Sequence, residues 1–164
     1  GESLKLHQAD IVEFVRYIGS GFKELATNRS IKFSIESECP GMNIWFDDTK
    51  MQRILNNIYS NAFKFTPDGG LISTIVATEK KDEKIFVRIE ISDTGCGISE
   101  KDLNVIFDRF YQGDLSHTTE GNGIGLTVVE KIIRLHGGNI TVHSEEGIGT
   151  TFVVTLPDIQ PRNT

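Results

Sequence analysis

Two asparagines and a lysine recur along one face of a predicted helix. Asn57, Asn61 and Lys64 stand at positions i, i+4 and i+7, a spacing that brings them together on a helix surface. Asparagine is a poor former of helix interiors, so two of them on one stripe need a reason. Carboxamide oxygens suit Mg²⁺, and an ammonium group suits a phosphate. The three side chains indicate a site for a metal ion paired with a phosphate, although a solvated stripe is the simpler alternative for either asparagine alone.

A second cluster, Asp93-Thr94-Gly95-Cys96-Gly97, follows directly after a predicted strand. A carboxylate at a strand end can accept a hydrogen bond from an exocyclic amine, and the glycines would let a flat ring approach the backbone. The alternative is a surface turn, since aspartate and glycine both favour turns. Cys96 is interpreted as a small apolar filler.

Glycines also lead from a polar loop into the last predicted helix, at Gly121, Gly123 and Gly125. Glycines before a helix N-terminus free backbone N–H groups to bind phosphate, where the helix dipole also favours anions. The spacing fits neither a P-loop nor a dinucleotide-binding fingerprint. This cluster alone is therefore weak evidence for a phosphate site.

Hydrophobic periodicity predicts the elements that position these clusters. Asp10, Asp48 and Ser99 are expected to cap helices. The expected helices span 11–25, 48–65, 99–106 and 124–136, and the expected strands span 4–8, 31–35, 44–46, 71–78, 85–91, 140–143 and 151–156. Residues 111–123 form a long polar loop, typical of a functional lid. We expect an α+β fold in two layers, with a mixed β-sheet covered on one face by helices.

Composition narrows the class of protein. The chain has 164 residues and a formal net charge of −6, which suits one soluble domain and disfavours general binding to nucleic acid or anionic membranes. No apolar run approaches the ~20 residues that span a bilayer. The two cysteines fit neither a disulfide framework nor a metal motif. We expect one domain over residues 1–157 and a tail or linker over 158–164.

The three clusters, in this order, resemble the N, G1 and G2 boxes of the histidine-kinase ATP-binding domain, which has a Bergerat-type fold of the GHKL class. Residues 106–111, Ile-Phe-Asp-Arg-Phe-Tyr, resemble the F box of the family, and residues 147–152, Gly-Ile-Gly-Thr-Thr-Phe, resemble its closing strand. The similarity covers about residues 4–157. The F box favours histidine kinases over other Bergerat ATPases, so the resemblance implies a sensor histidine kinase of a two-component system.

The resemblance implies a role for each matching residue. Asn61 would coordinate the Mg²⁺ that bridges the phosphates of ATP, and Asp93 would accept from the adenine amino group. Asn57, Lys64 and Arg109 would serve catalysis, with Lys64 against phosphate. Residues 111–123 would form the ATP lid. The remaining expected contacts with the nucleotide come from Asn57, Phe65, Gly95, Gly97, Ile98, Tyr111, Gly121, Asn122, Gly123, Ile124, Gly125, Leu126 and Thr150.

The resemblance also implies partners. The γ-phosphoryl group would pass to a histidine on the helical dimerisation domain of the same protein, N-terminal to residue 1, and indirectly to a response-regulator receiver domain. His7, His117, His136 and His143 lie outside any expected acceptor helix, and His136 is interpreted as a cation that stabilises a helix end. Direct contact with nucleic acid or a membrane is not expected, and the expected location is cytoplasmic.

Two alternatives remain at this point. A GHKL-type ATPase or an anti-sigma-like serine kinase typically carries a glutamate or another base in the N box, where this chain has Asn57, which disfavours hydrolysis. A nucleotide-binding module without catalysis is the other alternative. Asn61 and Asp93 are both present, which speaks against that module, and a nucleotide-binding assay would separate the possibilities.

Overall fold

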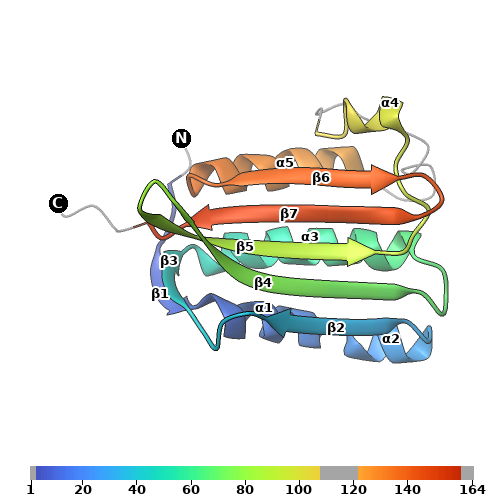
Figure 1. Ribbon diagram of the computed structural model, residues 1–164, viewed down its shortest axis with the longest axis horizontal. Coiled ribbons are helices and arrows are strands. Elements are labelled where there is room, and N and C mark those ends of the chain that lie inside the picture. The colour runs from blue at the N-terminus through green and yellow to red at the C-terminus, as the bar shows by residue number, and fades with distance from the viewer. Residues whose placement is uncertain (1–2, 108–121, 160–164) are drawn as a thin grey trace.

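The structure, a computed structural model, describes residues 3–107 and 122–159, with the backbone alone for the first four residues of α5 (Figure 1). Within these ranges no helix is long and apolar enough to cross a membrane. The elements are β1 (His7–Asp10), α1 (Ile11–Ser20), α2 (Lys23–Asn28), β2 (Lys32–Ser37), β3 (Asn43–Phe46), α3 (Asp48–Phe65), β4 (Leu71–Lys81), β5 (Lys84–Asp93), α4 (Glu100–Leu103), α5 (Asn122–Leu135), β6 (Asn139–Glu145) and β7 (Gly149–Pro157).

Five strands form the main sheet, in the order β2-β4-β5-β7-β6, while β1 and β3 pair separately. The β2–β4 pair is parallel, and the other pairs of the main sheet are antiparallel, so the sheet is mixed. Figure 1 shows α1, α2, α3 and α5 as one layer behind this sheet. The predicted α+β fold, a mixed sheet covered on one face by helices, is confirmed.

The core lies between the sheet and this helical layer. Phe152, Val154 and Leu156 alternate along β7 and are buried, while the residues between them are only partly covered. This period-2 pattern directs apolar side chains to the helices and polar ones to solvent. Tyr59 of α3 is fully buried and shares a 2.6 Å hydrogen bond with the Thr74 hydroxyl of β4. Burial raises the pKa of Tyr59 to about 12, although the bond to Thr74 opposes the shift.

The first helix differs from its expected span of 11–25. Asp10 caps α1 as predicted, since its Oδ1 accepts from Val12 N at 2.9 Å, but α1 ends at Ser20 and a separate helix, α2, follows. The chain bends at Gly21, and the bend directs Phe22 onto the ring of Phe63, at 5.4 Å between centroids. Burial of this aromatic pair offsets the cost of breaking the helix.

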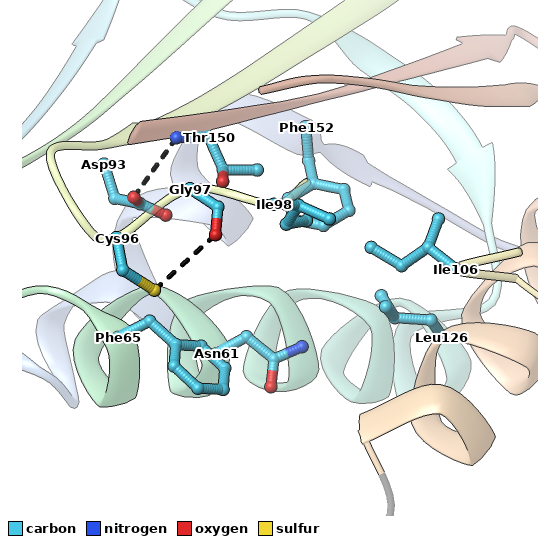
Figure 2. A pocket seen from close by; sticks show the side chains of 10 residues that line it. All are labelled: Asn61, Phe65, Asp93, Cys96, Gly97, Ile98, Ile106, Leu126, Thr150 and Phe152. Atoms are coloured by element: carbon cyan, nitrogen blue, oxygen red, sulfur yellow. Dashed lines mark hydrogen bonds between the residues drawn. The ribbon is translucent and has the colours of Figure 1, made fainter. Parts of the chain in front are cut away.

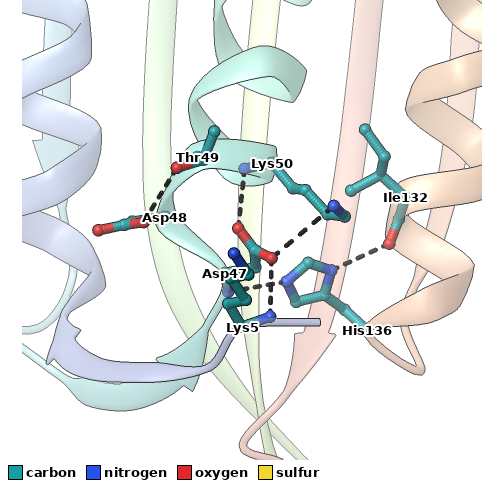
Figure 3. Close-up of polar contacts among 7 residues, drawn as sticks. All are labelled: Lys5, Asp47, Asp48, Thr49, Lys50, Ile132 and His136. Carbon is teal, nitrogen blue, oxygen red and sulfur yellow. Dashed lines mark hydrogen bonds and ion pairs between the residues drawn. The ribbon is translucent and has the colours of Figure 1, made fainter. Parts of the chain in front are cut away.

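The N-cap of α3 is Asp47 rather than the predicted Asp48. One carboxylate oxygen of Asp47 accepts from Lys50 N at 3.1 Å, and the other accepts from Lys5 N at 2.9 Å (Figure 3). Burial of the Asp47 carboxyl opposes its ionisation, but these two backbone donors and the Lys50 ammonium outweigh burial and hold its pKa below the ordinary value. The first strand is shifted from its expected span of 4–8, because β1 runs from His7 to Asp10.

The interpretation of His136 as a cation at a helix end is wrong. His136 is buried, its Nδ1 lies 2.9 Å from Ile132 O, and its Nε2 accepts from Asp47 N at 3.1 Å (Figure 3). These partners assign the proton to Nδ1, so the ring is neutral. His136 therefore joins the end of α5 to the start of α3, and the two helices that line the functional site are fixed to each other at their far ends.

Candidate functional site

An apolar pocket lies between α3 and the loop that follows β5, with α5 along its side (Figure 2). The pocket opens to solvent, and its volume is about 460 Å³ with the open mouth included. The pocket is lined by Asn61, Phe65, Asp93, Cys96, Gly97, Ile98, Ile106, Leu126, Thr150 and Phe152.

Local structure and strand pairing bring the lining residues of the pocket together. Asn61 and Phe65 stand one turn apart on α3, so their side chains share a face. Asp93 ends β5 and is paired in register with Thr150 near the start of β7. Antiparallel pairing therefore places these two residues beside each other, although 57 positions separate them in sequence.

Asp93 is prepared to accept a hydrogen bond from a ligand. Its Oδ1 accepts from Gly95 N at 2.8 Å and from Thr150 N at 3.3 Å. The second oxygen, Oδ2, has no hydrogen-bond partner among the described residues. Burial raises the pKa of Asp93, and the two backbone donors oppose that shift. A half-buried carboxylate oxygen that lacks a protein partner favours a donor on a bound molecule.

This shifted pKa predicts a pH dependence for ligand binding. Acceptance of a ligand N–H requires ionised Asp93, so we expect ATP affinity to fall as the pH is lowered through a pKa above that of an ordinary aspartate. The contribution of Asp93 to stability has the opposite sign, because a raised folded-state pKa stabilises the fold at low pH and this is lost as the pH rises through it.

Calorimetric titration of ATP across this range measures the effect. The phosphates of ATP also titrate, so Asp93→Asn serves as the control that shares this contribution and lacks the carboxyl. Parallel pH profiles for the wild type and Asp93→Asn would contradict the assignment of Asp93 as the acceptor.

The glycines of the β5–α4 loop are required by contacts within the protein. Gly97 has φ +74°, and a Cβ there would lie 2.2 Å from the carbonyl oxygen of Glu145. A Cβ on Gly95 would lie 2.7 Å from the carbonyl oxygen of Phe65. We expect these glycines to admit a flat ring. The structure gives a second reason for them, since they let the loop lie directly on β6 and on the end of α3.

Some of the predicted site residues lie beside the pocket rather than in its lining. Asn57 is half-buried one turn before Asn61 on α3. Lys64 and Gly95 line a groove on the other side of Phe65, and Lys64 Nζ lies 5.9 Å from the centroid of the Phe65 ring. Desolvation lowers the pKa of Lys64.

The rest of the predicted set falls in or beside the residues that the structure leaves undescribed. Arg109, Tyr111 and Gly121 lie outside the described residues, as does most of the expected lid over 111–123. Four more predicted residues are placed by their backbone only, at the start of α5: Asn122, Gly123, Ile124 and Gly125. Leu126, the next residue of α5, is buried and lines the pocket.

Three lining residues, Cys96, Ile106 and Phe152, were not predicted as site residues. Phe152 faces inward on β7, and its alternation with Thr151 could have indicated this. Cys96 is exposed rather than a buried filler. Burial of its sulfur nevertheless raises the pKa of the thiol, as do the nearby carboxylates of Asp93 and Glu146.

A mixed sheet with one helical layer, and a pocket between a helix and the loop after an inner strand, define the Bergerat-type ATP-binding class. Residues 46–160 match the family of histidine kinase-, DNA gyrase B-, and HSP90-like ATPases. The chain belongs to this family.

The curated relatives that the chain matches are histidine kinases. The chain is 35% identical to histidine kinase P4 of Formosa agariphila and 39% identical to hybrid signal transduction histidine kinase D of Dictyostelium discoideum, each over 160 residues. Each alignment covers 94% of this chain but only 11% and 10% of the respective relative. The chain thus spans about a tenth of these curated relatives.

Solved structures agree with this placement. The catalytic domain of histidine kinase ThkA, free of nucleotide, superposes with a TM-score of 0.81 at 26% identity, over 94% of this chain and 97% of that domain. Full-length ShkA in complex with AMPPNP gives a TM-score of 0.79 at 28% identity, over 95% of this chain and 32% of ShkA. The predicted resemblance to the histidine-kinase ATP-binding domain is confirmed.

Proposed function

We propose that this chain binds Mg²⁺-ATP and transfers the γ-phosphoryl group to a histidine on a separate helical dimerisation domain, as the catalytic domain of a sensor histidine kinase. The observation that carries the proposal is Asp93, whose Oδ2 has no hydrogen-bond partner among the described residues and lies at the end of an apolar pocket. The family and its histidine-kinase relatives support the same activity. We propose residues 1–157 as this domain and 158–164 as its tail, on the cytoplasmic side of the membrane.

Adenine recognition is assigned to the apolar part of the pocket. Asp93 Oδ2 accepts from the exocyclic amine of adenine, while Phe65 and Ile98 contact the faces of the ring. Thr150 holds the Asp93 carboxylate in place through its backbone N–H. Guanine carries a carbonyl oxygen where adenine carries the amine, so the site rejects guanine nucleotides. The ShkA structure holds AMPPNP, an adenine nucleotide, which supports this assignment.

We assign the end of the site that binds the phosphates to α3 and to the start of α5. Asn61 presents a carboxamide oxygen at the pocket, a donor type that Mg²⁺ accepts. The described residues hold no cluster of three or more His, Cys, Asp or Glu side chains that could bind a metal. This fits Mg²⁺, which typically uses few protein ligands and takes the rest from phosphates and water. Bound Mg²⁺ would offset the phosphate charge.

The chain's own residues around the phosphates bind and orient the nucleotide. Asn57 lies next to Asn61, and Lys64 reaches the phosphates from one turn further along α3. We assign Arg109 and Tyr111 of the F box to the binding of the phosphates, and the 111–123 segment to the role of ATP lid. Backbone N–H groups at the start of α5 complete the phosphate contacts, and they belong to the glycine-rich residues 121–126.

The phosphoryl acceptor is assigned to a different domain. Of the three histidines that the structure describes, none lines the pocket: His136 is buried against Asp47, while His7 and His143 are exposed on strands. Transfer requires the nucleophile within ~3–3.5 Å of the phosphorus and in line with the leaving oxygen. We assign the acceptor histidine to the helical dimerisation domain and the next transfer of the phosphoryl group to a response-regulator receiver domain.

Titration with ATP and with GTP in the presence of Mg²⁺ tests the nucleotide part of this function. We expect calorimetry to show one site for ATP and binding to GTP that is at least tenfold weaker. Equal affinity for the two nucleotides would refute adenine recognition by Asp93. Steady release of phosphate to water by the isolated chain would instead favour a GHKL-type ATPase, and binding without transfer to any acceptor would favour a non-catalytic module.

A further inference from the structure

An arginine outside the pocket caps the C-terminal end of α3, the helix that forms one wall of the pocket. Arg29 follows α2, and its guanidinium donates to two backbone carbonyls at the end of α3, those of Phe63 and Thr66. Its Nε donates to Asp68 Oδ1 at 2.8 Å, and its own carbonyl oxygen accepts from Gly69 N at 3.0 Å. A single residue thus holds four positions of the chain at the α3 terminus.

The two bonds to carbonyls are the important part of this arrangement. The last carbonyls of a helix lack partners within the helix and carry partial negative charge. A guanidinium suits them because it is a permanent cation with a planar fork of donors. The Arg29 side chain is only 26% exposed, whereas that of Asp68 is 75% exposed. An ion pair so open to solvent contributes little, so the carbonyl bonds account for the effect of Arg29.

The end of α3 is also the surface on which the nucleotide-binding loop rests. In the sequence, Phe65 lies between Phe63 and Thr66, whose carbonyls Arg29 holds. The carbonyl oxygen of Phe65 accepts a hydrogen bond from Cys96 N at 3.3 Å. Gly95 packs so closely on this carbonyl that an added Cβ would lie 2.7 Å from its oxygen. Phe65 and Cys96 both line the pocket, whereas Arg29 lines only the groove beside it.

We infer that Arg29 is a positioning residue for the nucleotide site. Its guanidinium fixes the terminal carbonyls of α3, which sets the position of Phe65 and, through the bond to Cys96 N, that of the loop that follows Asp93 and carries Gly97. Arg29 does not touch the nucleotide itself. The inference rests on the proposed function, in which this pocket binds the adenine of ATP.

Two arginine variants of the 164-residue chain form a matched test. Arg16 also donates to a backbone carbonyl, that of Ile35 at 2.8 Å, but it lies on α1, outside the residues that line the pocket. We expect Arg29→Ala to weaken ATP binding about tenfold, because only a fraction of the free variant would hold Phe65 and the loop in the position that binds ATP. The loss is expected to be equal for ADP and with or without Mg²⁺, because Arg29 acts on the adenine end. Arg16→Ala is expected to bind ATP as the wild type does.

A nucleotide-free measurement separates this inference from the proposed function. In amide NMR spectra, Arg29→Ala is expected to shift the Cys96 and Gly95 resonances, and Arg16→Ala is expected to leave them in place. A folded Arg29→Ala that keeps these resonances and wild-type affinity would overturn the inference. Failure of the wild type to bind ATP would instead refute the proposed function, while the amide shifts would still report on the link from Arg29 to the loop through the end of α3.

Two further variants keep the test decisive if Arg29→Ala does not fold. Arg29→Lys retains the cation but not the fork, so we expect an intermediate loss of affinity, about threefold. Asp68→Ala removes the exposed ion pair and keeps both carbonyl bonds, so we expect a change below about twofold. Wild-type affinity in Arg29→Lys, or a loss in Asp68→Ala equal to that in Arg29→Lys, would contradict the role of the carbonyl bonds.

Discussion

Asp93→Asn is expected to weaken ATP binding by about 10- to 100-fold while the fold is retained. The amide oxygen of the variant can still accept from Gly95 N and Thr150 N, so the loop keeps its anchor. The amide nitrogen, however, then occupies the place of Oδ2 and faces the amine of adenine with a second donor. A buried donor without a partner costs ~1–3 kcal/mol, and about 1.4 kcal/mol corresponds to tenfold in affinity. Calorimetric titration with ATP measures the loss.

Glu90→Gln is the matched control for this variant. It makes the same change of carboxylate to amide on the same strand, β5. Glu90, however, does not line the pocket, and its Oε1 lies 3.4 Å from Arg88 Nε. We expect its ATP affinity to equal that of the wild type. If Asp93→Asn also bound ATP with unchanged affinity, Asp93 would not be the residue that recognises adenine.

Asn61→Ala is expected to remove the increase in ATP affinity that Mg²⁺ confers. Asn61 is half-buried and lines the pocket, so the loss of its carboxamide removes an oxygen ligand without opening the core. Affinity for ATP in the presence of a chelator is expected to remain unchanged, because the adenine end of the site is intact. Titrations with and without Mg²⁺ therefore separate the metal contribution from that of the base.

Asn56→Ala provides the comparison on the same helix. It is also half-buried on α3 but does not line the pocket, and both variants gain the same helix propensity from alanine. We expect Asn56→Ala to retain the full Mg²⁺ effect. An Asn61→Ala variant with the same Mg²⁺ effect as the wild type would show that another group holds the metal.

Most of the fold could be predicted because its elements follow local patterns. The alternation in β7 and the apolar face of α3 are set by residues close in sequence. The break at Gly21 and the choice of Asp47 over Asp48 as N-cap depend on distant partners. Phe22 stacks on Phe63 instead of continuing the helix, and the Asp47 carboxylate accepts a hydrogen bond from Lys5 N. Such partners cannot be read from a local window.

The candidate site was predictable where a residue type and its element coincide. Asp93 at a strand end and Asn61 on a helix face required only the local pattern. The bond from Thr150 N to Asp93 depends on the pairing of β5 with β7, which local periodicity does not give. The same limit explains His136, because a lone histidine near a helix end does not reveal that Asp47 N lies beside its ring.

Phosphoryl transfer from ATP bound to this chain to a histidine on a separate domain can be measured directly. The wild-type chain is incubated with γ-labelled ATP and Mg²⁺, alone and with the purified helical dimerisation domain from the same protein. The Asp93→Asn variant is run in parallel. Acid-labile phosphate is then assigned to individual residues by mass spectrometry.

We expect no label on the chain alone, label on one histidine of the added domain, and much less of that label with Asp93→Asn. Rapid labelling of His7, His117, His136 or His143 in the pure chain would contradict the assignment of the acceptor to another domain. Absence of label on the added domain, under conditions where the wild-type chain binds ATP, would contradict the kinase activity itself.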